Sequence, residues 1–150
     1  MKKILLIGLM SGLCSTGAFA AACDISGTNA DVTAPTSATG PTGELCACNA
    51  GVAAKVKING GSGTPVATPV FVRTGFDVQC SSNTAVSFNE VSGTAFAVAS
   101  GSKKGNQSFK GTSNGGAVAV HLKCTGTNDA CNAADVTAAN AAATTIASGS

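Results

Sequence analysis

The chain has 150 residues, with 9 Lys or Arg, 7 Asp or Glu and a formal net charge of +2. So small a charge excludes the basic stripe that neutralises nucleic-acid phosphates, and we expect no nucleic-acid partner. Aromatic residues make up 4% of the chain, and Trp and Tyr are absent, so the core must be built from small side chains that each bury little area. We therefore expect the domain to need covalent cross-links or a partner chain.

The N-terminus has the features of an export signal. Lys2 and Lys3 precede an apolar stretch, Ile4–Met10, and Ala18–Ala20 supplies small residues at a cleavage position. This order predicts a secretory signal peptide over residues 1–20. The apolar stretch is shorter than the ~20 residues that a membrane-spanning helix needs. We expect a secreted or cell-surface protein, with the periplasm as the alternative and no transmembrane segment after cleavage.

Cleavage of the predicted signal peptide changes the net charge and the number of cysteines. It removes Lys2, Lys3 and Cys14, which leaves seven basic residues, seven acidic residues and an even number of cysteines. A neutral chain with few charges does not repel its own copies, so close association between copies is expected. Lipoprotein processing at Cys23 is a weaker alternative, because the bulky aliphatic residue it requires is missing.

Residues 21–43 are rich in Ala, Thr, Ser, Pro and Gly and are predicted to form a flexible N-terminal arm or an edge strand. Within them Ala30, Val32 and Ala34 alternate with polar residues. Residues 44–150 are predicted to form one β-rich, disulfide-bonded domain. Alternating apolar residues separated by Gly, Ser and Asn clusters predict its strands. The expected strands are Val52–Asn59, Val70–Arg73, Phe76–Cys80, Ala85–Asn89, Ala95–Ala99, Gln107–Lys110 and Ala117–Cys124. This rhythm predicts an all-β fold, an antiparallel sandwich or a barrel-like domain.

The Ala/Thr-rich segment at residues 132–150 is ambiguous between helix, strand and disorder. The words Ala30–Ala34 and Ala134–Ala138 are identical, Ala-Asp-Val-Thr-Ala. One interpretation is chance repetition in a chain of this composition. The other is that both words form equivalent strands, so that one could leave its own domain and complete a neighbour.

Six cysteines of the mature chain predict three disulfides. They are Cys23, Cys46, Cys48, Cys80, Cys124 and Cys131. Cys80 and Cys124 each end an expected strand on its apolar side, so a bridge between them is predicted, with Cys124–Cys131 as the main competitor. Cys46 and Cys48 are too close in the chain to pair with each other without strain, and Cys23 is one natural partner for them.

No group of residues predicts catalysis, a cofactor or a metal. His121 is the only histidine and alternates onto the polar side of its strand, which does not suit a catalytic triad. A metal site from Cys46, Cys48, Cys124 and His121 is a weak alternative, because it lacks a paired CxxC framework. The chain is therefore not expected to be an enzyme.

The composition resembles that of bacterial pilins in general, although the apolar, Tyr-ending C-terminal strand of chaperone–usher subunits is absent. We expect a secreted structural or adhesive surface protein that self-associates, and a subunit of an extracellular fibre assembled by strand addition is one form of this hypothesis. The alternative is a monomeric periplasmic binding module for a ligand, metal or partner protein.

Overall fold

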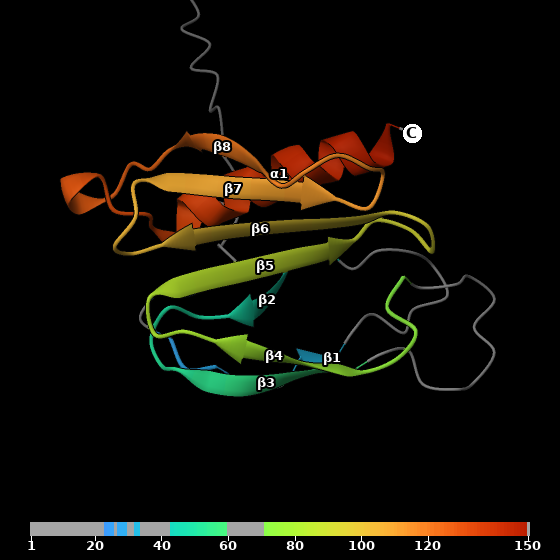
Figure 1. Cartoon of the computed structure of the whole chain (residues 1–150), viewed down its shortest axis with the longest axis horizontal. Helices are drawn as coiled ribbons and strands as arrows, with labels where there is room; N and C mark the ends of the chain where they lie inside the picture. The colour runs from blue at the N-terminus through green and yellow to red at the C-terminus, as the bar shows by residue number, and fades with distance from the viewer. Residues whose placement is uncertain (1–22, 26, 30–31, 34–42, 60–70, 150) are drawn as a thin grey trace, which may run out of the picture.

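Residues 23–25, 27–29, 32–33, 43–59 and 71–149 are described by the computed structural model of the chain, and they form two β-sheets and an α-helix (Figure 1). The predicted signal peptide at residues 1–20 lies outside these residues. Within the described part of the chain, no helix combines the length and apolar character needed to cross a lipid bilayer.

The larger sheet has five antiparallel strands in the order β2-β5-β6-β7-β8. Its members are β2 (Leu45–Cys48), β5 (Thr84–Glu90), β6 (Phe96–Ser102), β7 (Gln107–Thr112) and β8 (Ala119–Lys123). Because the sheet is open, with β2 and β8 at its edges, the predicted barrel-like closure is wrong. The prediction of mostly antiparallel β-structure is confirmed.

The smaller sheet pairs β3 (Ala54–Asn59) with β4 (Phe76–Cys80) in antiparallel register, and the short β1 (Val32–Thr33) runs parallel to β3 on its other side. β4 is therefore an edge strand. The predicted strand at Phe76–Cys80 is confirmed in full. The predicted strand at Val70–Arg73 is wrong for described residues 71–73, which follow an irregular path.

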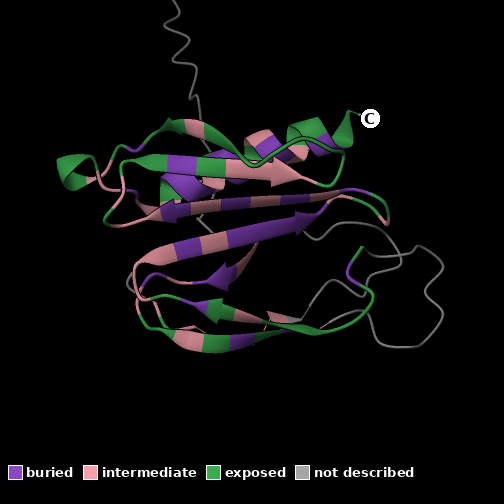
Figure 2. Cartoon of the chain, viewed as in Figure 1, coloured by how far each residue is buried: buried purple, intermediate pink, exposed green. Residues whose placement is uncertain are grey.

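The larger sheet is the middle layer of the described structure (Figure 1). One face carries α1 (Ala133–Ser148), where Ala85 of β5 packs with Val136. The other face meets the smaller sheet, where Phe88 of β5 packs with Ile58. Because strand residues alternate between faces, β5 supplies both cores and is buried along nearly its whole length, whereas β8 is largely exposed (Figure 2).

The C-terminal segment is a helix, which resolves the ambiguity in the sequence and makes the fold β-rich with one helix instead of all-β. Its buried stripe, Val136, Ala139, Ala143 and Ala147, recurs at helical spacing. Small side chains allow the helix to approach the sheet closely. A Cβ atom at Gly101 of β6 would lie 3.0 Å from the Val136 Cγ2 atom and 3.1 Å from the Cys131 Cβ atom, so a larger residue there would require these side chains to shift.

The start of α1 is held by reciprocal hydrogen bonds. The Asn132 side chain accepts from the Asp135 backbone N–H at 3.0 Å, and the Asp135 carboxylate accepts from the Asn132 N–H at 2.9 Å. This capping box satisfies N–H groups that have no partner inside the helix. The Thr125 hydroxyl also donates to Asp135 at 2.8 Å, which ties the helix start to the chain after β8.

Replacing Asn132 with alanine is expected to lower the free energy of unfolding by about 1 kcal/mol, because one helical N–H loses its acceptor. Chemical denaturation followed by circular dichroism measures this loss. Asn132→Ser is the matched control, since its hydroxyl can still cap the helix and should keep most of the stability. Equal losses in the two variants would show that the cap is not the cause.

The two copies of Ala-Asp-Val-Thr-Ala adopt different structures, so the interpretation of them as equivalent strands is wrong. Val32–Thr33 of the first copy forms β1, whereas Ala134–Ala138 lies in the first turns of α1. The second copy follows a capping residue and contributes the capping carboxylate of Asp135. The first copy has β3 beside it, so tertiary context decides the conformation.

Three disulfides are formed, which confirms their number and indicates an oxidising, non-cytoplasmic compartment. They join Cys23 to Cys46, Cys48 to Cys80 and Cys124 to Cys131. The predicted Cys80–Cys124 bridge is wrong, because Cys80 ends β4 in the smaller sheet while Cys124 follows β8 at the far edge of the larger one. The competing local bridge, Cys124–Cys131, is the one that forms.

The described part of the N-terminal arm is anchored on the domain. Cys23 is buried and cross-linked to Cys46, and the Asn49 side chain accepts from the Asp24 N–H at 2.8 Å and donates to the Thr28 carbonyl at 2.7 Å. These contacts hold residues 23, 24 and 28 of the predicted arm against the domain. The Asn29 side chain adds a contact to the chain just before β3 by donating to the Val52 carbonyl.

Candidate functional site

The most distinctive surface feature is an apolar cleft of about 190 Å³ between the two sheets. Among the described residues, all of its lining side chains are hydrocarbon, and they come from five strands. They are Ala47, Ile58, Phe76, Val78, Val86, Phe88, Phe96 and Val98. We call this set the apolar cleft. Such a lining offers no hydrogen-bonding side chain, so only apolar groups can be recognised there.

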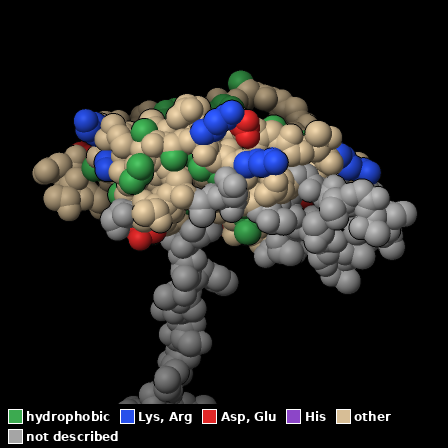
Figure 3. Space-filling view, turned by 90° about the horizontal axis from the view of Figure 1, so that it is seen from below, with side chains coloured by type: hydrophobic (Ala, Val, Ile, Leu, Met, Phe, Trp, Pro, Cys, Tyr) green, Lys and Arg blue, Asp and Glu red, His purple; other side chains and the backbone are tan. Residues whose placement is uncertain are grey.

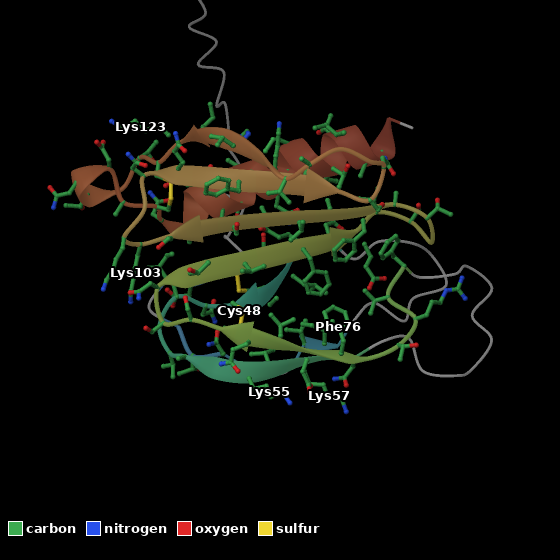
Figure 4. All side chains as sticks on the ribbon, viewed as in Figure 1. Cys48, Lys55, Lys57, Phe76, Lys103 and Lys123 are labelled. Atoms are coloured by element: carbon green, nitrogen blue, oxygen red, sulfur yellow. A yellow bond between two sulfur atoms is a disulfide. The ribbon has the colours of Figure 1, made fainter. Side chains whose placement is uncertain are left out.

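The cleft stays open because the smaller sheet ends at β4. Phe76 and Val78 project from β4 toward the larger sheet, yet no strand among the described residues pairs with the free side of β4, and Phe76 is 49% exposed. The Phe76 ring lies beside the gap between the sheets, while Lys55 and Lys57 of β3 point away from it (Figure 4). Phe76 therefore forms part of the rim of the cleft.

Aromatic rings line the floor of the cleft and continue past it. The Phe96 ring lies between those of Phe71 and Phe88, with centroid distances of 5.0 and 5.6 Å. Interplanar angles of 23° and 21° make this a row of nearly parallel rings. Rings in this arrangement attract each other beyond their burial of area, which keeps the floor in place.

Apolar surface continues from the cleft across β7 to the edge of the sheet. Gly111 of β7 lies between Val98 of the cleft and Val118, since a Cβ atom there would meet their methyl groups at 3.3 and 3.2 Å. On the same face Phe109 pairs directly with Val120 of β8. Val118, Val120 and Leu122 are 67, 49 and 61% exposed. We call Phe109, Val118, Val120 and Leu122 the β7–β8 patch.

The outer face of the smaller sheet has the opposite character. Lys55 and Asp77 form an ion pair at 2.7 Å, with Lys57 beside them on β3. The hydrogen bond and charge of Lys55 lower the pKa of Asp77, and Asp77 raises that of Lys55. Charged side chains of both signs are dispersed over the molecule as seen from below (Figure 3). This hydrated face is a poor candidate for apolar contacts.

The charged side chains near the β7–β8 patch are Lys123 at the end of β8 and Lys110 of β7, which pairs with Ala119. Lys123 ends β8 and pairs with Asp129 at 2.7 Å. Burial, with the charge of Lys110, lowers the pKa of His121, so its imidazole is neutral at neutral pH. The stretch from Val118 to Leu122 therefore carries no charge under these conditions, as self-association of an edge strand requires.

One carboxylate is enclosed near the floor of the cleft. Glu90 ends β5 and is 2% exposed, and its carboxylate faces the backbone N–H groups of Val72 and Phe71. Burial raises the pKa of Glu90, and the backbone amides of Val72 and Phe71 offset this only in part. Its neighbour across the sheet is Phe96, so the acid sits beside the aromatic row.

The buried polar groups under α1 are structural. Asn140 donates to the Ser87 hydroxyl at 3.1 Å and accepts from Thr144 at 3.3 Å, and Thr144 accepts from Asn89 at 3.1 Å. This chain of amides and hydroxyls contains no acid or base that could move a proton. It holds the helix in register on β5.

The residues considered for a metal site do not come together as ligands. Cys46, Cys48 and Cys124 are each used in a disulfide, and His121 is on β8. No group of three or more potential ligands occurs among the described residues. The cysteines predicted to form disulfides do so. The apolar cleft was not predicted, although the alternation of apolar residues in β4, β5 and β6 is the sequence pattern that could have indicated it.

Searches of protein-family models, curated proteins and solved structures find no match to the chain. Function must therefore be argued from the cleft and the patch themselves.

Proposed function

We propose that this protein is a secreted structural or adhesive surface subunit whose copies associate through the β7–β8 patch. The observation that supports this most directly is the exposure of Val120 and Leu122 on the edge strand β8 and of Val118 just before it. An edge strand presents unpaired backbone groups, and exposed apolar side chains beside them favour pairing with another chain. The disulfides suit the oxidising surroundings of such a subunit.

The partner that fits this edge is the β8 strand of a second copy. Ala119–Leu122 contains no Asp, Glu, Lys, Arg or Pro, and such uncharged β-prone segments pair readily with themselves. In an antiparallel pair the two Lys123 side chains lie at opposite ends of the joined strands, whereas a parallel pair would place them together. Charge therefore favours a two-fold, antiparallel contact.

A contact between two β8 strands closes at a dimer, because each copy uses the same surface. Growth into a fibre needs a second contact elsewhere. The described N-terminal residues are held by the Cys23–Cys46 bridge and by Asn49, so donation of that segment to a neighbour would require these contacts to break. The dimer through β8 is thus the form of strand addition that the geometry supports best.

Val120→Lys is expected to weaken dimerisation of the oxidised mature protein at least tenfold, because it places a charge in the middle of the apolar contact. Sedimentation equilibrium over a range of concentrations measures the effect. Val52→Lys is the matched control: Val52 is 50% exposed against 49% for Val120, but it precedes β3, away from the patch. Its dimerisation should match the parent. A parent that stays monomeric at millimolar concentration would refute the proposed contact.

A monomeric binding module is the second candidate, and the apolar cleft is the observation that favours it. A preformed concavity between two sheets is a common location for small-ligand sites. The sedimentation experiment separates the two candidates, because a binding module needs no concentration-dependent dimer.

A further inference from the structure

We infer that the apolar cleft binds the aromatic ring of a small, uncharged molecule. This inference does not rest on the proposed association of copies, because none of the cleft residues belongs to the β7–β8 patch. It rests on the volume of the cleft, the chemistry of its lining and the arrangement of its rings.

The volume matches one ring. The cleft encloses about 190 Å³, and a dry apolar cavity of about 150 Å³ lined by Leu, Ile and Phe is known to hold benzene. A single ring with a methyl substituent therefore fits. A fused polycyclic ligand or a long acyl chain would have to extend out over Val98 into solvent.

The lining selects against polar ligands. The eight lining side chains in the described part of the chain are hydrocarbon, so a hydroxyl or carboxylate that entered would lose its water without gaining a partner among them. Aliphatic groups of equal size can also bury area there. An aromatic ring gains more, because Phe76, Phe88 and Phe96 offer it offset or edge contacts.

The row of rings gives the site its geometry. Phe88 and Phe96 are nearly parallel, 5.6 Å between centroids, and are held by cross-strand neighbours in β5 and β6. Phe76, on the opposite sheet, is 49% exposed and stands at the rim. A ligand ring can therefore enter past Phe76 and rest against a floor that is already formed, so binding requires little reorganisation.

The test is a titration of the oxidised mature protein with toluene, followed through the methyl resonances of Ala47, Val78, Val86 and Val98. We expect saturable shifts confined to the cleft, with a dissociation constant below about 1 mM. Phenol, the matched polar probe, should bind several-fold more weakly. Non-saturating shifts, or shifts spread over the whole domain, would overturn the inference.

Val98→Phe should weaken toluene binding at least tenfold by filling the mouth, and Val52→Phe, the same change outside the cleft, should leave it unaltered. If Val98→Phe does not fold, Val78→Ile tests the same point with one added methylene. Equal affinity in the filled and control variants would overturn the assignment.

Two further measurements separate this inference from the proposed dimer. Val120→Lys should bind toluene as the parent does, whatever its state of association. If the methyl resonances of the cleft instead shift on dilution without ligand, a second copy occupies the cleft and the inference of a small-molecule site is wrong.

Discussion

Replacing both Cys48 and Cys80 with alanine is expected to lower the free energy of unfolding by about 4 kcal/mol, enough to unfold much of the domain under mild conditions. The bridge closes a loop with a sequence separation of 32, and the chain-entropy model gives a loss of this order when such a cross-link is removed. Urea denaturation of the oxidised variant and the parent, followed by circular dichroism, measures the difference.

The location of this bridge gives the effect a further cause. Cys48 lies on β2 of the larger sheet and Cys80 on β4 of the smaller sheet, and the strands of the two sheets do not pair with each other in the described residues. Cys48–Cys80 is the disulfide that crosses the core beneath the cleft. Its loss should therefore loosen the cleft before it affects α1.

The matched control is the pair Cys124→Ala and Cys131→Ala. That bridge has a sequence separation of 7, and the same model gives a loss of about 2 kcal/mol. Its removal should affect the start of α1 instead of the cleft, because Cys131 directly precedes the capping residue Asn132. Equal losses in both double variants, or a larger loss in the control, would contradict the account of Cys48–Cys80 as the main link between the sheets.

Strand alternation could be predicted because it depends only on local spacing. In β3 the buried Val56 and Ile58 alternate with exposed Lys55 and Lys57, and this pattern is visible in the sequence. The helix could not be predicted in the same way. Its buried face consists mostly of alanine, and alanine also fills its exposed face at Ala138, so burial leaves no clear apolar periodicity.

The disulfide pairing depends on a detail of register that the sequence does not display. A regular strand would direct Cys46 and Cys48 to the same face. A register shift between them lets Cys46 pack on the helix side while Cys48 enters the core between the sheets. The two cysteines therefore reach different partners, Cys23 and Cys80.

The cleft could not be predicted because it lies where the smaller sheet leaves part of the larger sheet uncovered. Val86 and Val98 alternate as core residues in their strands, and nothing local distinguishes a covered position from an open one. In the part of the chain that the structure describes, the smaller sheet ends at β4, and this leaves Phe76 at the rim of the cleft.

Glu90→Gln is expected to stabilise the protein by about 1–2 kcal/mol at pH 8, because burial penalises the charged carboxylate more than the backbone N–H groups of Val72 and Phe71 compensate, and to have little effect near pH 4. The folded-state pKa of Glu90 is raised by burial above its value in the unfolded chain. The unfolded chain therefore releases the proton first, and the parent loses stability as pH rises from the unfolded pKa through the folded one. Glutamine has no proton to lose, so its stability should not fall over that range.

Asp77→Asn is the control of opposite sign. The ion pair with Lys55 lowers the pKa of Asp77, so any stability that this carboxylate adds is present above its unfolded pKa and is lost as pH falls. Denaturation of both variants at pH 4, 6 and 8 separates the cases. The stability gained by Glu90→Gln relative to the parent should increase with pH, whereas Asp77→Asn should not become more stable relative to the parent as pH rises. A Glu90→Gln gain independent of pH would mean that shape, and not charge, limits the fit of the side chain beside Phe96. Because Glu90 borders the aromatic row, a pH-dependent gain would also show that the floor of the cleft is dry enough to penalise a charge, which is the property that an apolar ring site requires.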